Sequence, residues 1–134
     1  MRGVSLVFCL IGWLLVSCSK STEDRLWGKW QLREVVSPAG VEQVDTVWYN
    51  FQNSLFLFQV YRPQSDSMQY CYGYNTVTNE TEIQLDLISN PKPVAQFLPY
   101  TDWVDRQRTF RIDKLTGSEL ILSDEEQTYR FRKF

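Results

Sequence analysis

The sequence contains no histidine among its 134 residues. This absence excludes Ser-His-Asp and Cys-His nucleophile arrangements, histidine proton shuttles and histidine metal ligands. Basic residues are not in excess either, because 14 Lys and Arg stand against 16 Asp and Glu, and no basic stripe runs along the chain. We therefore expect no nucleic acid among the partners, and no metal or other cofactor.

Long apolar runs are also missing, apart from one at the N-terminus. After Met1 and Arg2, residues 4–16 are apolar except for Ser5 and Gly12. The run is shorter than the roughly 20 residues that cross a bilayer, and is typical of a secretory signal peptide. It ends in Leu15-Val16-Ser17-Cys18, which looks like a bacterial lipobox, where the cysteine thiol is acylated and becomes the mature N-terminus. A plain signal peptide and an uncleaved anchor are the alternatives.

The predicted organisation follows from this cleavage. Residues 1–17 form a lipoprotein signal peptide, residues 18–25 a lipidated N-terminus with a polar tether, and residues 26–134 one domain. Cysteine is scarce, with three in the whole chain. Cys9 leaves with the signal peptide and Cys18 carries the lipid, so Cys71 has no partner for an internal disulfide. We expect Cys71 to be a small buried side chain.

A long helical pattern is absent from residues 26–134, where only residues 94–98 suit one helical turn, and strand-like alternation takes its place. Residues 81–87 show it clearly, with Ile83, Leu85 and Leu87 on one face and polar side chains on the other. Turn residues separate eight such segments, which are residues 27–36, 44–52, 55–62, 68–77, 81–87, 108–113, 119–123 and 127–133. Short connections favour an antiparallel up-and-down sheet, and closure into an eight-stranded barrel removes its edges. A β-sandwich is the alternative.

Both ends of this domain carry a resemblance to a known family. Leu26-Trp27-Gly28-Lys29-Trp30 resembles the Gly-X-Trp signature of lipocalins, and residues 117–122 with 128–133 resemble the last hairpin of lipocalin-like domains common in Bacteroidota lipoproteins. The resemblance implies an up-and-down barrel with Trp30 at its closed end. It also implies that an arginine near the last strand, Arg130 or Arg132, packs across the Trp30 ring.

Two segments are candidates for ligand binding. Tyr70, Tyr72 and Tyr74 alternate on one face of a strand; we expect this face to point into the barrel and to line a partly polar cavity, whereas an exposed row would stack on sugars or aromatics. Residues 89–104 contain three prolines and no strand pattern. Long irregular connections are often lids, so Phe97, Tyr100 and Trp103 either contact a ligand at the barrel mouth or plug that end and complete the core.

The function predicted from the sequence is non-catalytic binding by a monomer anchored to the outer membrane, facing the periplasm or the cell surface. The ligand would be a small apolar or amphipathic molecule inside the barrel. The alternative is a filled barrel that binds another envelope protein. A weaker alternative is a hydrolase that uses carboxylates of residues 102–105 or 124–126, which we expect to be solvated in loops. An open cavity of about 300 Å³ or more inside the barrel would favour the small-ligand hypothesis, and a filled interior would favour the protein partner.

Overall fold

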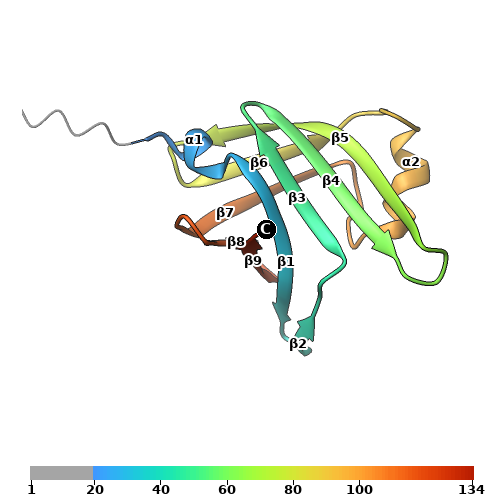
Figure 1. Cartoon of the computed structure of the whole chain (residues 1–134). Helices are drawn as coiled ribbons and strands as arrows, with labels where there is room; N and C mark the ends of the chain where they lie inside the picture. Colours follow the sequence, from blue (N-terminus) through green and yellow to red (C-terminus); the bar gives the residue numbers. More distant parts are fainter. Residues whose placement is uncertain (1–19) are drawn as a thin grey trace, which may run out of the picture.

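The structure is a computed structural model that describes residues 20–134, so the predicted signal peptide and Cys18 lie outside the described residues. Strands dominate the chain (Figure 1). The elements are α1 (Thr22–Leu26), β1 (Gly28–Ser37), β2 (Gly40–Gln43), β3 (Val47–Gln52), β4 (Leu55–Arg62), β5 (Ser67–Thr78), β6 (Glu82–Leu87), α2 (Val94–Phe97), the 3₁₀ helix η1 (Leu98–Tyr100), β7 (Gln107–Leu115), β8 (Glu119–Ser123) and β9 (Thr128–Lys133).

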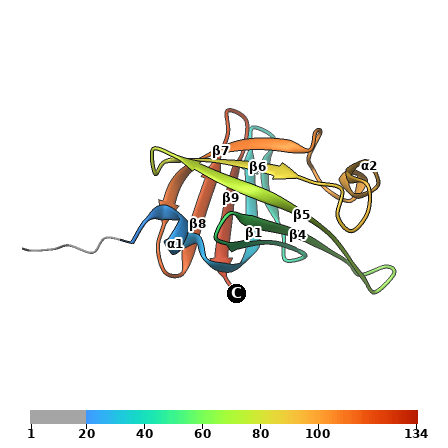
Figure 2. The same ribbon diagram turned by 90° about the horizontal axis from the view of Figure 1, so that it is seen from above.

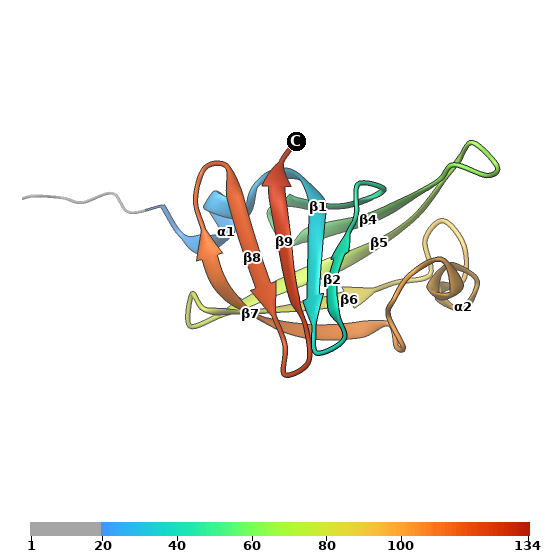
Figure 3. The same ribbon diagram turned by 90° about the horizontal axis from the view of Figure 1, so that it is seen from below.

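Eight of these strands close into a barrel. Each of β1, β3, β4, β5, β6, β7, β8 and β9 pairs antiparallel with the next, and β9 returns to β1. The closing register runs from Trp30 opposite Lys133 to Val36 opposite Thr128, and Figure 3 shows β1 and β9 side by side. The predicted eight-stranded antiparallel barrel is therefore confirmed, and the chain does not form the alternative β-sandwich.

The ninth strand, β2, extends the barrel wall at one end of β1. It pairs with residues 34–37 of β1, whereas β3 pairs with residues 28–31 on the same side. The turn before it needs Gly40, whose φ of 128° disfavours any side chain. The sequence analysis missed β2 because all four of its residues are exposed, so it carries no apolar alternation.

The barrel interior is filled by large side chains that alternate inward along the strands. Tyr49 of β3 lies at the centre of this packing, with ring centroids 4.8 Å from Phe58 and 4.7 Å from Phe131. The largest fully buried side chains are Trp30, Tyr49, Tyr129, Phe56, Phe58, Phe110 and Phe131. Cys71 is also buried, as predicted, and burial raises the pKa of its thiol.

Helix α1 closes one end of the barrel. Thr22 is only 4% exposed, and its backbone N–H donates to Glu80 Oε2 at 2.7 Å. Leu26 is buried, and its carbonyl accepts a hydrogen bond from Trp30 Nε1 at 2.8 Å. Residues 22–25, which the sequence analysis assigned to a polar tether, therefore form α1 and belong to the folded domain. A helix this short carries too little periodicity to be recognised from sequence.

Trp30 lies at this closed end, as the resemblance implied, but the cation over its ring is different. Lys133 Nζ lies 4.4 Å from the Trp30 ring centroid. Arg130 instead pairs with Glu34 at 3.6 Å, and Arg132 is exposed. The expectation of an arginine partner is wrong because Arg130 and Arg132 occupy outward positions of β9. Lys133 is the residue opposite Trp30 in the β1–β9 register.

The segment between β6 and β7 closes the opposite end. Figures 1 and 2 both show α1 and α2 at opposite ends of the barrel. Phe97 and Trp103 are buried in the main core, whereas Tyr100 is exposed. Of the two readings for this segment, the plug is confirmed for Phe97 and Trp103. Within residues 20–134, no helix is long and apolar enough to cross a membrane.

Candidate functional site

The tyrosine row of β5 faces outward. Tyr70, Tyr72 and Tyr74 are 41%, 39% and 48% exposed, whereas the alternate positions Cys71 and Gly73 are buried. The expectation that the row lines the barrel interior is wrong. The reason lies in the neighbouring strand, where the buried rings of Phe58 and Phe56 stand opposite Cys71 and Gly73.

Gly73 also shows how little room remains on the inner side of β5. A Cβ added at Gly73 would lie 2.4 Å from the Asp86 carbonyl oxygen of β6. Real Cβ atoms do not approach a backbone oxygen this closely, so any larger side chain at this position would displace β6. The large side chains of β5 are therefore confined to its outer face.

The tyrosines continue into the outer faces of β4, β3 and β1. In one cross-strand row, Lys29 stands beside Asn50, then Leu57, then Tyr72, and in the next row Gln31, Trp48, Gln59 and Tyr70 follow in the same order. Neighbouring strands lie about 4.8 Å apart, so these side chains form one surface. We call it the aromatic wall and define it by Trp27, Trp48, Leu55, Leu57, Met68, Tyr70, Tyr72 and Tyr74.

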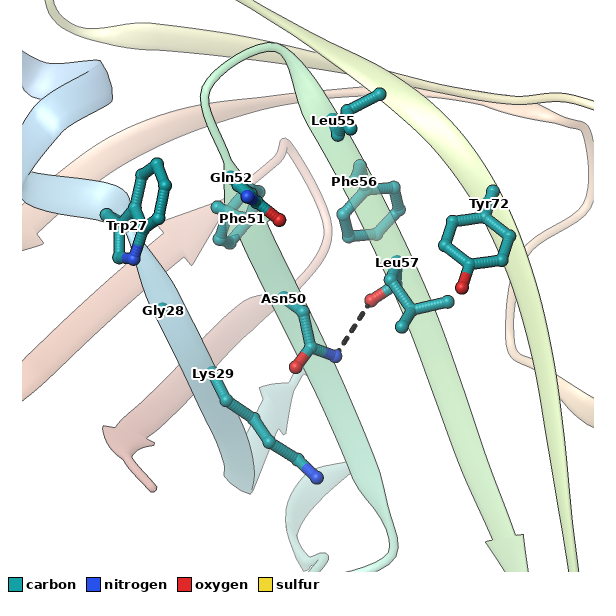
Figure 4. A pocket seen from close by; sticks show the side chains of 10 residues that line it. All are labelled: Trp27, Gly28, Lys29, Asn50, Phe51, Gln52, Leu55, Phe56, Leu57 and Tyr72. Carbon is teal, nitrogen blue, oxygen red and sulfur yellow. Dashed lines mark hydrogen bonds between the residues drawn. The ribbon is translucent and has the colours of Figure 1, made fainter.

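A groove of about 410 Å³ lies on this wall. In Figure 4, Trp27 stands at one side of the groove and Tyr72 at the other, with Asn50, Gln52 and Leu57 between them. The Asn50 amide nitrogen donates to the Leu57 carbonyl at 3.1 Å and to Gln59 Oε1 at 3.0 Å. Asn50 is thereby fixed, and Figure 4 shows its amide oxygen turned away from Leu57.

The groove is nearly free of charge. Among its described lining residues there is no Asp or Glu, and the one side chain that is charged at neutral pH is Lys29. Its ammonium lies 5.2 Å from the ring centroid of Trp48 and 4.8 Å from that of Phe134. The opposite side of the barrel carries cross-strand ion pairs instead, such as Lys114–Glu119 at 3.0 Å.

A second, smaller cavity opens at the mouth of the barrel beside η1. It measures about 200 Å³, and its apolar lining includes Leu32, Val35 and Val60. Tyr49 and Phe58 form its inner surface, and Tyr100 lies at its rim, so Tyr100 is the member of the predicted trio that contacts open space. The volume is below the roughly 300 Å³ of an ordinary ligand pocket.

A polar network next to this mouth centres on Arg108, whose side chain is 15% exposed. Its guanidinium donates to Asp124 Oδ2 at 2.8 Å and lies 3.7 Å from Asp102 Oδ2. Tyr129 donates its hydroxyl proton to Asp102 at 2.5 Å, and its ring centroid lies 4.7 Å from the guanidinium carbon. The expectation that these carboxylates are solvated holds for Asp102, whose side chain is 47% exposed, and is wrong for Asp124, whose side chain is 28% exposed and paired with Arg108.

The electrostatics of this network suit a structural role. Burial, together with the neighbouring Asp102 carboxylate, raises the pKa of Tyr129. Burial alone would raise the pKa of Asp124, but the hydrogen bond from Arg108 and two backbone N–H donors outweigh burial and lower it. A carboxylate held ionised in this way is not a proton donor near neutral pH. The network ties the connection between β6 and β7 to the ends of β7 and β9.

Sequence reasoning did not identify Arg108 and Tyr129 as partners of Asp102 and Asp124. The register of β7 and β9 brings them together, and no local motif marks that contact. Within the described part of the chain, no group of three or more His, Cys, Asp or Glu residues is placed to hold a metal ion.

A family model described as a lipocalin-like domain matches residues 13–134. The chain belongs to this lipocalin-like family. Two solved structures support the assignment. A lipocalin-like protein from Bacteroides uniformis ATCC 8492 is 31% identical, with a TM-score of 0.70, and the match covers 82% of this chain and 99% of that one.

The second structure is an uncharacterized protein from Bacteroides eggerthii DSM 20697, also 31% identical, with a TM-score of 0.65. The match covers 81% of this chain and 99% of that one. No curated protein matches the chain. The predicted resemblance to lipocalin-like proteins of Bacteroides is thus confirmed.

Proposed function

We propose that this lipocalin-like protein is a non-catalytic binding protein whose partner docks on the aromatic wall. One observation supports this proposal. A groove of about 410 Å³ lies outside the barrel, beside the exposed rings of Tyr72 and Trp27. The interior is occupied by side chains of the core. Contiguous exposed apolar surface on a soluble domain marks interaction sites.

Anchoring at Cys18 would place this wall beside a membrane. Helix α1 begins at Thr22, four positions after Cys18, and such a segment spans at most about 14 Å. The lipid would therefore hold the α1 end of the barrel close to the bilayer. The aromatic wall runs along the side of the barrel, so it would be reachable by other envelope components on whichever membrane face the protein occupies.

Photo-crosslinking in the cells that produce the protein tests the docking site. A photoreactive phenylalanine analogue replaces Tyr72 in the full chain, and a matched control carries it at Arg132 on the exposed outer face of β9. We expect a discrete crosslinked species from position 72 and none from position 132. The same pattern from both positions, or no crosslink at all, would refute the proposal. The anchor is tested separately, because C18S should abolish labelling by a fatty-acid analogue.

A second candidate is a small apolar ligand at the barrel mouth. It is favoured by the cavity of about 200 Å³ that reaches Tyr49 and Phe58 and has Asp102 and Thr101 at its polar rim. Native mass spectrometry of protein purified from its own envelope checks it. A co-purifying small molecule that is lost when Val60 is replaced by Trp would establish this candidate, and a ligand-free mass would remove it.

A further inference from the structure

We propose that the aromatic wall binds an uncharged polysaccharide chain. This inference rests on the docking site proposed above and adds the chemical class of the occupant. A sugar ring presents an apolar C–H face, surrounded by hydroxyl groups at its rim. A surface that recognises it therefore combines exposed aromatic faces with neutral hydrogen-bonding groups, and both are present here in adjacent cross-strand positions.

The aromatic side chains supply the stacking surfaces. Tyr72 and Trp27 flank the groove, and Trp27 is 50% exposed. The ring centroids of Tyr70 and Tyr72 lie 6.0 Å apart with their planes at 89°. Perpendicular rings do not form a flat platform, so they suit the successive, rotated units of a single chain better than the flat face of a crystalline polymer.

The groove floor supplies the hydrogen bonds. Asn50 and Gln52 lie between the two aromatic sides (Figure 4). The amide nitrogen of Asn50 is already engaged with Leu57 and Gln59, so its amide oxygen is the group that a hydroxyl can reach. A protein partner with a dry, apolar interface core would bury these amides without hydrogen-bond partners, which is unfavourable. Sugar hydroxyls pair with them directly.

Charge argues for a neutral chain. No carboxylate lines the groove, and the ammonium of Lys29 already lies over the rings of Trp48 and Phe134. An anionic polymer would find one engaged cation rather than the row of basic side chains that phosphate or carboxylate polymers need. The amide-lined floor and the missing charge together favour a neutral polysaccharide over a protein or an acidic polymer.

Affinity electrophoresis tests the inference, with the full chain run through gels that contain one polysaccharide each. The panel holds neutral glucan, mannan and xylan, with polygalacturonate as the acidic counterpart. We expect at least one neutral polymer to retard the protein. Y72A should weaken that retention about tenfold or more, which corresponds to about 1.4 kcal/mol. Y72F keeps the ring and should bind within about twofold of the parent chain.

K114A, on the opposite side of the barrel, is the matched surface control and should bind like the parent, and melting curves confirm that Y72A is folded. The inference is overturned if no neutral polymer retards the protein, if Y72A binds like the parent, or if polygalacturonate binds most tightly. If position 72 crosslinks to a protein and no polysaccharide binds, the inference of a polysaccharide ligand would be overturned, whereas the proposed docking site would stand. Loss of both signals would remove both proposals.

Discussion

The hydrogen bond between Trp103 and Tyr49 is one of the contacts that join the plug at the barrel mouth to the core. Trp103 Nε1 donates to the Tyr49 hydroxyl oxygen at 3.0 Å, and both side chains are buried. Burial and the nearby Asp102 raise the pKa of Tyr49, so its hydroxyl stays neutral across the ordinary pH range. The pair is therefore a neutral hydrogen bond in an apolar surrounding, and a double-mutant cycle measures it.

Each single substitution leaves one buried group without its partner. Y49F leaves the Trp103 N–H unpaired, which costs about 1–3 kcal/mol of the free energy of unfolding. W103F leaves the Tyr49 hydroxyl unpaired and also removes about 40 Å² of buried apolar area, which adds about 1 kcal/mol at about 25 cal/mol per Å². The double variant has no unpaired group, so it should lose less than the sum by about 1–2 kcal/mol.

Urea unfolding followed by circular dichroism checks this, because W103F changes tryptophan fluorescence directly. Y61F serves as the matched control, since the Tyr61 hydroxyl donates to Asp66 on the exposed surface and its loss should cost less than about 0.5 kcal/mol. Y61F should also be additive with W103F. If Y49F and W103F were additive within about 0.3 kcal/mol, the reasoning that this bond fastens the plug would be refuted.

Two further predictions concern the ends of the barrel. K133M removes the cation over Trp30 and should lower the free energy of unfolding by about 0.5–2 kcal/mol, whereas K133R should restore most of it in the same urea assay. D124N removes the charge that Arg108 binds and should destabilise the fold at neutral pH by about 1–3 kcal/mol. Because the pKa of Asp124 is lowered in the folded state, its stabilisation is present above the unfolded pKa of about 4 and is lost as the pH falls through the folded value. At pH 7 the urea midpoint of D124N should therefore lie below that of the parent chain, and at pH 2 the two midpoints should converge. E125Q, in the same turn, should have the midpoint of the parent chain at both pH values.

The strands were predictable from the sequence because each carries its own alternation. Residues 81–87 and 119–123 have one fully apolar face, and the structure places strands at Glu82–Leu87 and Glu119–Ser123. Turn residues mark the connections, and closure follows from the cost of an open edge. Helix α1 and strand β2 were missed for the same reason, since neither is long enough to repeat a pattern.

The orientation of the candidate site could not be predicted in the same way. A period of two shows which residues of β5 share a face, but it does not show which face is inside. Hydropathy is a poor guide here, because Tyr72 on the outer face is larger and more apolar than Gly73 on the inner face. The choice is made by the adjacent strand, and the β4–β5 register is a long-range property that no single segment carries.

Likewise, the cation over Trp30 depends on a register rather than on a motif. The resemblance pointed to an arginine from the last strand, and this chain has two there. Both alternate with the buried Phe131 and therefore point outward. Lys133, at the end of β9, is the residue that pairs opposite Trp30. A lysine therefore supplies the cation over the ring that the resemblance assigned to an arginine.

The filled interior and the aromatic outer wall have one physical origin. Phe56 and Phe58 of β4 fill the interior opposite Gly73 and Cys71, and the backbone of β6 leaves no room for a Cβ at Gly73. The large side chains of β5 must then stand outside, where they meet the outward residues of β4 and β3. Here the packing that removes the internal cavity also builds the external surface, which is why we place binding on the wall and not in the barrel.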